Sequence, residues 1–305
     1  EMKKCKYADS LAAGCIAAGG SLGFLIPPSI AFVVYGIVTE QSVGELLISG
    51  FLPGVLLAIA FIFVVIFQVK RNPMLAPLNL ERVSWRDRLE SLKNVWTVLL
   101  VFLLVMGGIY GGVFTPTEAG AGGVFAILII SVFRRKLTRR GFFESLMNAM
   151  TLSCMIFAII FGAFLFKNFL VLSRLPTALV TTATGIAASK YLILASILLV
   201  FLIMGCFVTS TPLIILLVPA VLPCIEALGF SPIWFGVISV LMVEAGTITP
   251  PVGQNVYLLG GIARDIPITT IFRGASPFLI AIFIVVIILV AFPQIALVLP
   301  ELMLR

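Results

Sequence analysis

Two stretches of the sequence hold at most one charged residue over a much greater length than one membrane helix needs. The first runs from position 191 to position 225, and the second runs from 227 to 263 with Glu244 as its only charged residue. A helix crosses the hydrocarbon core of a bilayer in about 20 apolar residues. Of the 305 residues, 61% are hydrophobic and 11% are charged, whereas a soluble domain carries about 25% charged residues. The sequence therefore predicts an all-α polytopic membrane protein that contains more than simple spans.

Shorter apolar segments predict ordinary spans, and charged loops orient them. The predicted spans are 46–69, 94–113, 119–133, 145–166 and 274–300. The loops at 70–93 and 134–140 are rich in Lys and Arg, and the positive-inside rule places such loops in the cytoplasm. The segment between the two loops is then a two-helix hairpin. Its outward turn, at 114–118, ends in Glu118, which we expect to cap the following helix.

Several kinds of chemistry are disfavoured by what the sequence lacks. It has no histidine, its five cysteines form no CxxC pair, and it contains neither a nucleotide-binding glycine motif nor a nucleophile elbow. The sequence therefore lacks the residues that catalysis by histidine, metal chemistry or ATP-driven transport would use. We expect no enzyme and no cofactor. The excess of basic residues does not indicate nucleic-acid binding, because these residues lie in short loops between apolar segments.

Two segments share a pattern in which glycine precedes a proline pair. They read GGSLGFLIPPSI at 19–30 and EAGTITPPVGQN at 244–255. Two successive prolines force an unwound stretch, which a membrane tolerates only where it is buried in protein or lines a wet cavity. Freed carbonyls there suit a hard cation, and half-helix N-termini attract anions. Two such breaks predict an inverted-repeat secondary transporter. The alternative is that the prolines only shape helix packing.

The uncharged segment at 204–223 has a polar centre, formed by three consecutive hydroxyl residues at 209–211 and followed by Pro212. Its length fits a re-entrant hairpin with the hydroxyls at the tip, or two short spans joined by a polar turn. Glu244 lies beside the second break, and an acid at membrane depth is by default a functional candidate. Its alternative role is structural, paired with Arg264 or with a backbone donor.

These segments resemble the large membrane subunit of the tripartite ATP-independent periplasmic (TRAP) transporters. The matching segments, in chain order, are GGSLGFLIPPSIAFVVYG (19–36), FLPGVLLA (51–58), GGVFTPTEAGAGG (111–123), GFSPIWFGVI (229–238), GTITPPVGQNVYLLGGIA (246–263) and FPQIALVLPELM (292–303). The resemblance extends along the chain from one end to the other.

The resemblance implies a fold, a mechanism and two partners. The fold is an elevator-type transporter, in which a transport domain with two re-entrant hairpins and two broken helices slides against a scaffold. The implied activity is sodium-driven symport of a C4-dicarboxylate, a sialic acid or a similar carboxylated solute across the bacterial inner membrane. The partners are a periplasmic substrate-binding protein and a small membrane subunit. Sodium is the coupling ion.

The resemblance also assigns site residues. The sodium ligands come from the first break, the hairpin tip and the second break: Gly20, Gly23, Ile26, Pro28, Ser29, Gly205, Thr209, Ser210, Gly246, Thr249, Pro250 and Gly253. The substrate contacts are Ser29, Ser210, Thr211 and Asn255. Glu244 is added to this set as the intramembrane acid.

Two departures from the family affect these assignments. The family carries its first hairpin upstream of the segment that matches EMKKCKY, so we expect the first sodium site to have only half its ligands here. The hairpin tip often has an Asp where this chain has Thr209, which removes a negative charge near the second site.

We expect four regions along the chain: a first broken helix at 1–45, mainly scaffold at 46–175, the hairpin and second broken helix at 176–263, and a C-terminal span at 264–305. Two other functions stay open. One is an organic-anion transporter of the same superfamily that works without a binding protein. The other, from a different class, is an ion channel, although two non-identical breaks in one chain argue against a pore built of repeated rings.

Overall fold

The computed structural model describes residues 4–76, 85–174 and 189–303, together with Met2, Ala178, Val180 and Thr181. Every regular element in these residues is helical, which confirms the predicted all-α fold. Five helices are long and apolar enough to cross a membrane, or six if the bent pair at 9–39 counts as one span. Part of the predicted loop at 70–93 lies outside the described residues, as does most of 175–188.

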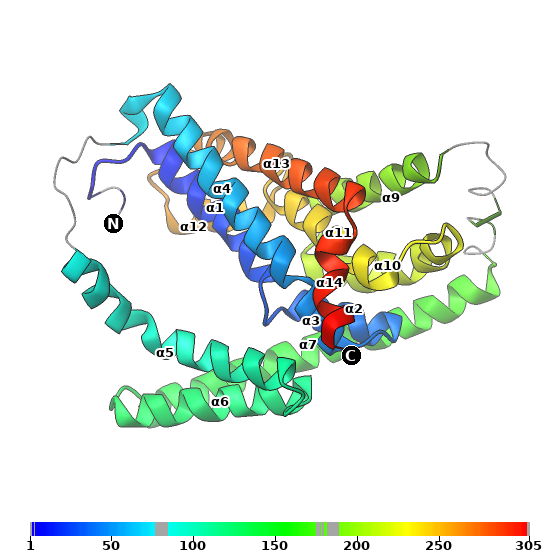
Figure 1. Cartoon of the computed structure of the whole chain (residues 1–305), viewed down its shortest axis with the longest axis horizontal. Helices are drawn as coiled ribbons and strands as arrows, with labels where there is room; N and C mark the ends of the chain where they lie inside the picture. Colours follow the sequence, from blue (N-terminus) through cyan, green and yellow to red (C-terminus); the bar gives the residue numbers. More distant parts are fainter. Residues whose placement is uncertain are drawn as a thin grey trace. The chain divides into compact units, whose positions relative to one another are not determined.

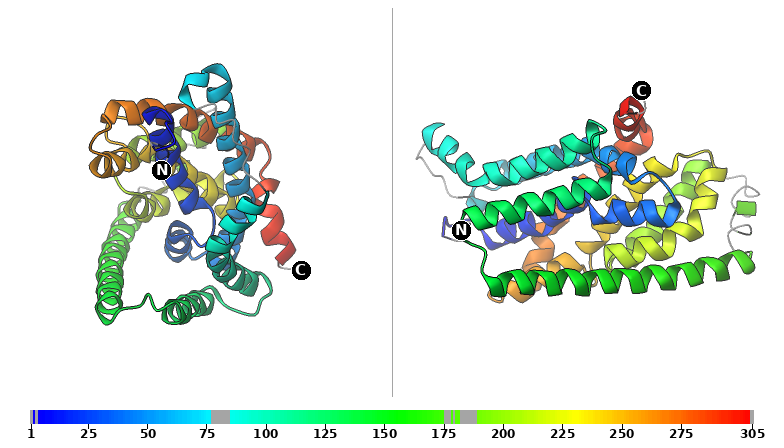
Figure 2. Two further views of the ribbon diagram at one scale, coloured as in Figure 1. Left: turned by 90° about the vertical axis from the view of Figure 1, so that its left-hand side faces the viewer. Right: turned by 90° about the horizontal axis from the view of Figure 1, so that it is seen from below.

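The chain forms two compact units, one of residues 79–161 and the other of residues 1–78 and 162–305. The smaller unit contains α5 (Trp85–Tyr110), α6 (Pro116–Phe133) and the first part of α7 (Arg139–Leu172). α7 is one long helix (Figure 2). The smaller unit lies wholly within the region 46–175 that the sequence predicts to be mainly scaffold.

α5 and α6 form the hairpin that the charged loops predict, and they lie side by side (Figure 2). Near the turn, the ring of Phe114 lies against Gly108. At the other end of the pair, Nη2 of Arg134 donates to Oγ1 of Thr97 over 2.6 Å. These contacts at opposite ends show that the helices run antiparallel.

The turn of this hairpin, at 114–118, confirms Glu118 as a capping residue. The backbone N–H of Thr115 donates to Oε2 of Glu118 over 2.8 Å, and the N–H of Glu118 donates to Oγ1 of Thr115 over 3.3 Å. This reciprocal pair satisfies two backbone donors that a helix start leaves free.

The larger unit is built of ten α-helices and one 3-10 turn among the described residues. They are α1 (Asp9–Leu25), α2 (Ile30–Thr39), α3 (Val43–Ser49), α4 (Phe51–Arg71), η1 (Pro73–Leu75), α9 (Lys190–Gly205), α10 (Ser210–Ala227), α11 (Pro232–Thr247), α12 (Gln254–Ile262), α13 (Ile268–Ala291) and α14 (Gln294–Met303). The end of α7 also belongs to this unit.

α11 forms the core of the larger unit. Every residue from Trp234 to Thr247 is buried, because α1, α2, α3, α9, α10, α12, α13 and α14 all contact this helix. Figure 1 shows α11 among its neighbours α9, α10 and α13. A helix that is apolar all round is stable in a protein core or in the bilayer, and the contacts of α11 show that it is enclosed by other helices. The polar groups near the end of α11 are therefore enclosed as well.

α1 packs most extensively against α13, and glycine makes the close approach feasible (Figure 1). A Cβ added to Gly14 would lie 2.2 Å from the carbonyl oxygen of Gly274, and one added to Gly274 would lie 1.9 Å from the carbonyl oxygen of Ser10. Small residues that let two backbones meet are the usual basis of tight helix contacts in membranes.

The C-terminal region differs from the single predicted span at 274–300. α13 ends at Ala291 and α14 begins at Gln294. Pro293 lies between them, and Phe292 has φ −129° and ψ 74°. The helix ends here because the residue before a proline is pushed out of the helical region.

The α1–α13 contact can be tested with two glycines of the same helix. We expect Gly14→Ala to lower stability by about 1–3 kcal/mol, the usual cost of overpacking, because the new methyl group would meet backbone atoms of α13. Gly19→Ala is the control, since a Cβ there has no neighbour within 4 Å. Thermal unfolding of the purified protein in detergent measures the difference. Equal midpoints for the two variants would contradict the close contact.

Candidate functional site

The first predicted break is present between α1 and α2. The two helices are bent by 41°, and residues Ile26–Ser29 separate them. The peptide bond between Pro27 and Pro28 is cis. Ser29, which is 2% exposed, caps α2: its Oγ accepts from the N–H of Phe32 over 3.4 Å and donates to the carbonyl of Phe24. The hydroxyl therefore bridges both sides of the break.

The first break packs against the start of α4. A Cβ added to Gly54 would lie 2.7 Å from the side chain of Ile26. One added to Gly50 would lie 2.6 Å from the carbonyl oxygen of Leu25. Pro28 is exposed at the bend. Glycine at both positions therefore lets α4 begin directly against the unwound segment.

The hairpin of α9 and α10 meets the second break. Since α10 is long and apolar enough to cross a membrane, this hairpin fits either predicted alternative, a re-entrant hairpin or two spans joined by a polar turn. α9 and α10 are joined by the turn 206–209, and residues 248–253 separate α11 from α12. The N–H of Gly253 donates to the carbonyl of Cys206 over 3.2 Å. Gly253 has φ +58°, a conformation that glycine adopts without strain. The peptide bond between Pro250 and Pro251 is cis.

Two glycines bring the ends of α9 and α11 into backbone contact. A Cβ added to Gly246 would lie 2.5 Å from the carbonyl carbon of Gly205, and one added to Gly205 would lie 2.9 Å from the carbonyl oxygen of Val243. The predicted ligands Gly205, Gly246 and Gly253 are thus gathered at one place. The carbonyls around the break can converge there because no side chain separates the segments.

Polar side chains line the same region. Oγ1 of Thr249 donates to the carbonyl of Ala245 over 2.6 Å. Nδ2 of Asn255 donates to Oγ1 of Thr247 over 3.1 Å. The same Nδ2 would lie 3.4 Å from a Cβ at Gly20, so α1 joins this site through one of its predicted residues.

Glu244 is buried beside these groups, with 1% of its surface exposed. Oγ of Ser210 donates to its Oε1 over 2.6 Å. Oγ1 of Thr247 donates to the backbone carbonyl of Glu244 over 2.7 Å. Arg264 is exposed and is not its partner, so the alternative role as an ion pair with Arg264 is wrong. The acid is held by hydroxyl groups.

The other predicted site residues make fewer hydrogen bonds, or are more exposed, in the part of the chain that the structure describes. Thr209 is the N-cap position of α10, but its side chain makes no capping hydrogen bond. Thr211 is half-buried, whereas Pro250 and Gly23 are exposed. Sequence reasoning missed Ser21 and Thr247. Both are hydroxyl residues within the two proline-pair segments, and this position is the only feature of the sequence that indicates a role for them.

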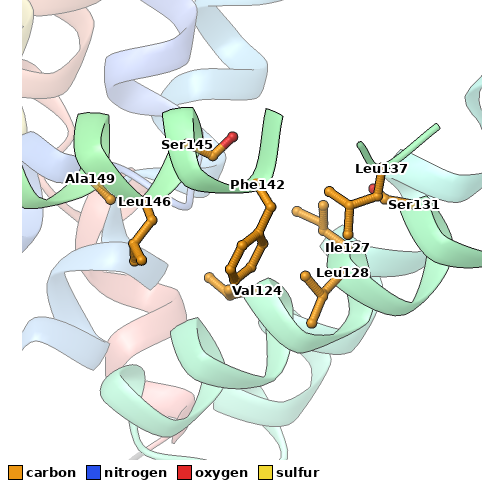
Figure 3. Close-up of a pocket in the computed structure, with 9 residues that line it drawn as sticks. All are labelled: Val124, Ile127, Leu128, Ser131, Leu137, Phe142, Ser145, Leu146 and Ala149. Carbon is orange, nitrogen blue, oxygen red and sulfur yellow. The ribbon is translucent and has the colours of Figure 1, made fainter. Parts of the chain in front are cut away.

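A cavity in the smaller unit is unrelated to the breaks. It has a volume of about 320 Å³ and lies between α6 and the start of α7 (Figure 3). Its lining is Val124, Ile127, Leu128, Ser131, Leu137, Phe142, Ser145, Leu146 and Ala149. Two serines are its only polar side chains, so its lining carries no charged group that could pair with an anionic solute or with a cation.

Comparison with known proteins assigns the chain to a family. Residues 1–295 match the family described as "Tripartite ATP-independent periplasmic transporter, DctM component". The chain belongs to this family. The match includes both breaks and the hairpin.

Several relatives of known substrate are similar over nearly the whole chain. It is 35% identical over 304 residues to the sialic acid TRAP transporter large permease protein SiaM of Vibrio cholerae, covering 99% of this chain and 70% of that protein. It is 35% identical over 301 residues to the C4-dicarboxylate large permease DctM of Pseudomonas aeruginosa, covering 98% and 70%. It is 31% identical over 306 residues to the ectoine large permease TeaC of Halomonas elongata, covering 100% and 70%.

The family sets the coarse function. The chain is a large permease of a TRAP transporter, a multi-pass protein of the bacterial inner membrane and not an enzyme. It is one component of a tripartite system. The sequence resemblance to this family is therefore confirmed.

The contact between the hairpin and the second break can be tested at Gly246. We expect Gly246→Ala to abolish most solute uptake, because the added methyl group would meet the backbone of Gly205, which cannot move aside cheaply. Gly261→Ala is the control, since a Cβ there meets nothing within 4 Å. Uptake into proteoliposomes is the measurement. Wild-type uptake by Gly246→Ala would show that α9 and α11 do not need this approach.

Proposed function

We propose that this chain is the membrane subunit that couples inward sodium flow to the uptake of a carboxylated organic solute. The observation that carries the proposal is the meeting of the hairpin turn and the second break around a buried acid. Unwound backbone at that point leaves carbonyl oxygens outside helical hydrogen bonding, and hydroxyl groups surround them. Such oxygens suit a hard monovalent cation.

The residues around the second break fit a sodium ion. Hydroxyl groups are available at Ser210 and Thr249, and backbone carbonyls are available near Gly205, Gly246 and Pro250. Sodium bound there would supply positive charge, which neutralises the charge of an anionic solute. The first-break residues would form a second site in the same way, with Ser29 as its hydroxyl ligand.

The proposed solute is an organic acid. The names of two relatives specify sialic acid and C4-dicarboxylates, and both kinds of solute carry carboxylates. α12 starts at Gln254, and the N-terminus of a helix presents partial positive charge to an anion. Asn255, in the first turn of α12, and the hairpin hydroxyls at Ser210 and Thr211 would orient the carboxylate.

Two further components complete the proposed system. A periplasmic substrate-binding protein would deliver the solute, and a small membrane subunit would accompany this chain. Transport would occur by an elevator motion, in which the hairpin and the broken helices move with the solute and the bound ions. The tripartite nature of the family supports this arrangement.

Sodium coupling is tested by reconstitution of the complete transporter into proteoliposomes. With the cognate binding protein present, we expect uptake of a sialic acid or a C4-dicarboxylate to require an inward sodium gradient. Omission of the binding protein should abolish it. Full uptake in choline buffer would refute sodium coupling, and full uptake without the binding protein would favour a transporter that works alone.

The role of Thr249 is tested by removing its hydroxyl group. We expect Thr249→Val to raise the sodium concentration for half-maximal uptake by about five- to tenfold, because one oxygen ligand is lost. Thr39→Val is the matched control: Thr39 is buried, and its Oγ1 likewise donates to a carbonyl four residues earlier, at Tyr35, over 2.7 Å. An unchanged sodium requirement in Thr249→Val, at normal expression, would remove Thr249 from the site.

A further inference from the structure

We infer that Glu244 is the anionic ligand of a cation site shared by α1, α10 and α11, with hydroxyl oxygens from Ser21 and Ser210. The inference rests on the sodium coupling proposed above and adds a charged ligand and a third helix to the second site.

Glu244 has no cationic side chain as a partner in the described part of the chain. Its carboxyl group is 1% exposed, and no Lys or Arg among the described residues forms an ion pair with it. A carboxylate removed from water without a compensating positive charge is strongly unfavourable. A bound cation would supply that positive charge and so favour the ionised form of the carboxyl group.

The hydroxyl groups near the carboxyl of Glu244 have few protons to donate to it. Thr247 has one hydroxyl proton. That proton goes to the backbone carbonyl of Glu244 over 2.7 Å, because Oε2 of Glu244 is more distant, at 3.5 Å. Oε1 receives the proton of Ser210 over 2.6 Å. Oε2 therefore has only a long contact with Thr247, and it keeps lone pairs that could bind a cation.

Ser21 of α1 places another oxygen next to Glu244. This residue is 1% exposed, and its hydroxyl lies beside the carboxyl of Glu244. Glu244 is a group that this hydroxyl can engage, but Oγ of Ser21 forms no hydrogen bond of good geometry with the described residues. A buried polar group left unsatisfied costs free energy and calls for an explanation. Coordination of a cation between Ser21 and Glu244 would use this oxygen.

The position of these ligands links two parts of the chain. Ser21 precedes the first break, whereas Ser210 starts the helix that follows the hairpin turn. A cation bound by both would hold α1 and α10 together through Glu244 on α11. Loading of the ion would therefore favour the arrangement in which the hairpin lies against the broken helices.

The test is sodium binding by the purified transporter complex, measured apart from transport. The thermal unfolding midpoint is recorded as NaCl replaces choline chloride at constant ionic strength. A ligand that binds the folded state raises the midpoint. We expect Glu244→Gln, which keeps the shape and can still accept from Ser210, to raise the apparent dissociation constant for sodium by about tenfold or more. Ser21→Ala should raise it by a smaller factor.

Two control variants match these substitutions. Ser239→Ala removes another buried hydroxyl group from α11, one that bonds only to the carbonyl of Gly236. Glu226→Gln neutralises an exposed acid at the end of α10. Both variants should keep the wild-type dissociation constant for sodium.

The outcomes separate this inference from the proposed function. Sodium-dependent stabilisation with the wild-type dissociation constant in Glu244→Gln would overturn the inference and leave sodium coupling intact. If Glu244→Gln does not fold, Ser21→Ala decides: an unchanged dissociation constant overturns the inference, and a raised one supports it. If sodium changes neither the thermal unfolding midpoint nor the solute uptake of the wild-type complex, the inference and the proposed function are both overturned.

Discussion

A chain inside a bilayer has to satisfy its own backbone hydrogen bonds, because the hydrocarbon supplies neither donors nor acceptors. The two proline breaks interrupt this pattern, and each is stabilised by contacts from neighbouring segments. At the first break, the hydroxyl of Ser29 serves both sides of the gap. At the second break, the N–H of Gly253 finds the carbonyl of Cys206 in the hairpin turn. The hairpin and the break are therefore one structural unit, since the break depends on the hairpin for a backbone partner.

The same constraint explains why the polar groups gather at the end of α11. This helix is enclosed by its neighbours from Trp234 to Thr247, so each polar side chain on it must find a partner inside the protein. Ser239 finds one on its own helix, at the carbonyl of Gly236. Glu244 instead needs Ser210 of α10. The best-buried helix thus carries the group that depends most on the hairpin.

Features that depend on local sequence were predictable. A proline pair breaks its own helix regardless of tertiary packing. The capping by Glu118 likewise involves residues only three positions apart in the sequence. Single prolines were harder to interpret. Pro219 and Pro277 lie inside helices, whereas Pro293 separates α13 from α14. A helix tolerates the loss of one hydrogen bond when packing on both sides holds it, and packing is not visible in the sequence.

Features that depend on helix packing were not predictable. The sequence identified Glu244 as a candidate but not its partners, because Ser21 and Ser210 come from helices far away along the chain. The contact of Gly205 with Gly246 was hidden for the same reason. Small residues there serve packing and binding together: they let backbones approach, and that approach gathers the carbonyls. A cation bound between the segments would stabilise the packed arrangement by mass action. Under the proposed sodium coupling, the ion would favour the packed arrangement only by the difference between its affinities for the packed and the unpacked arrangement.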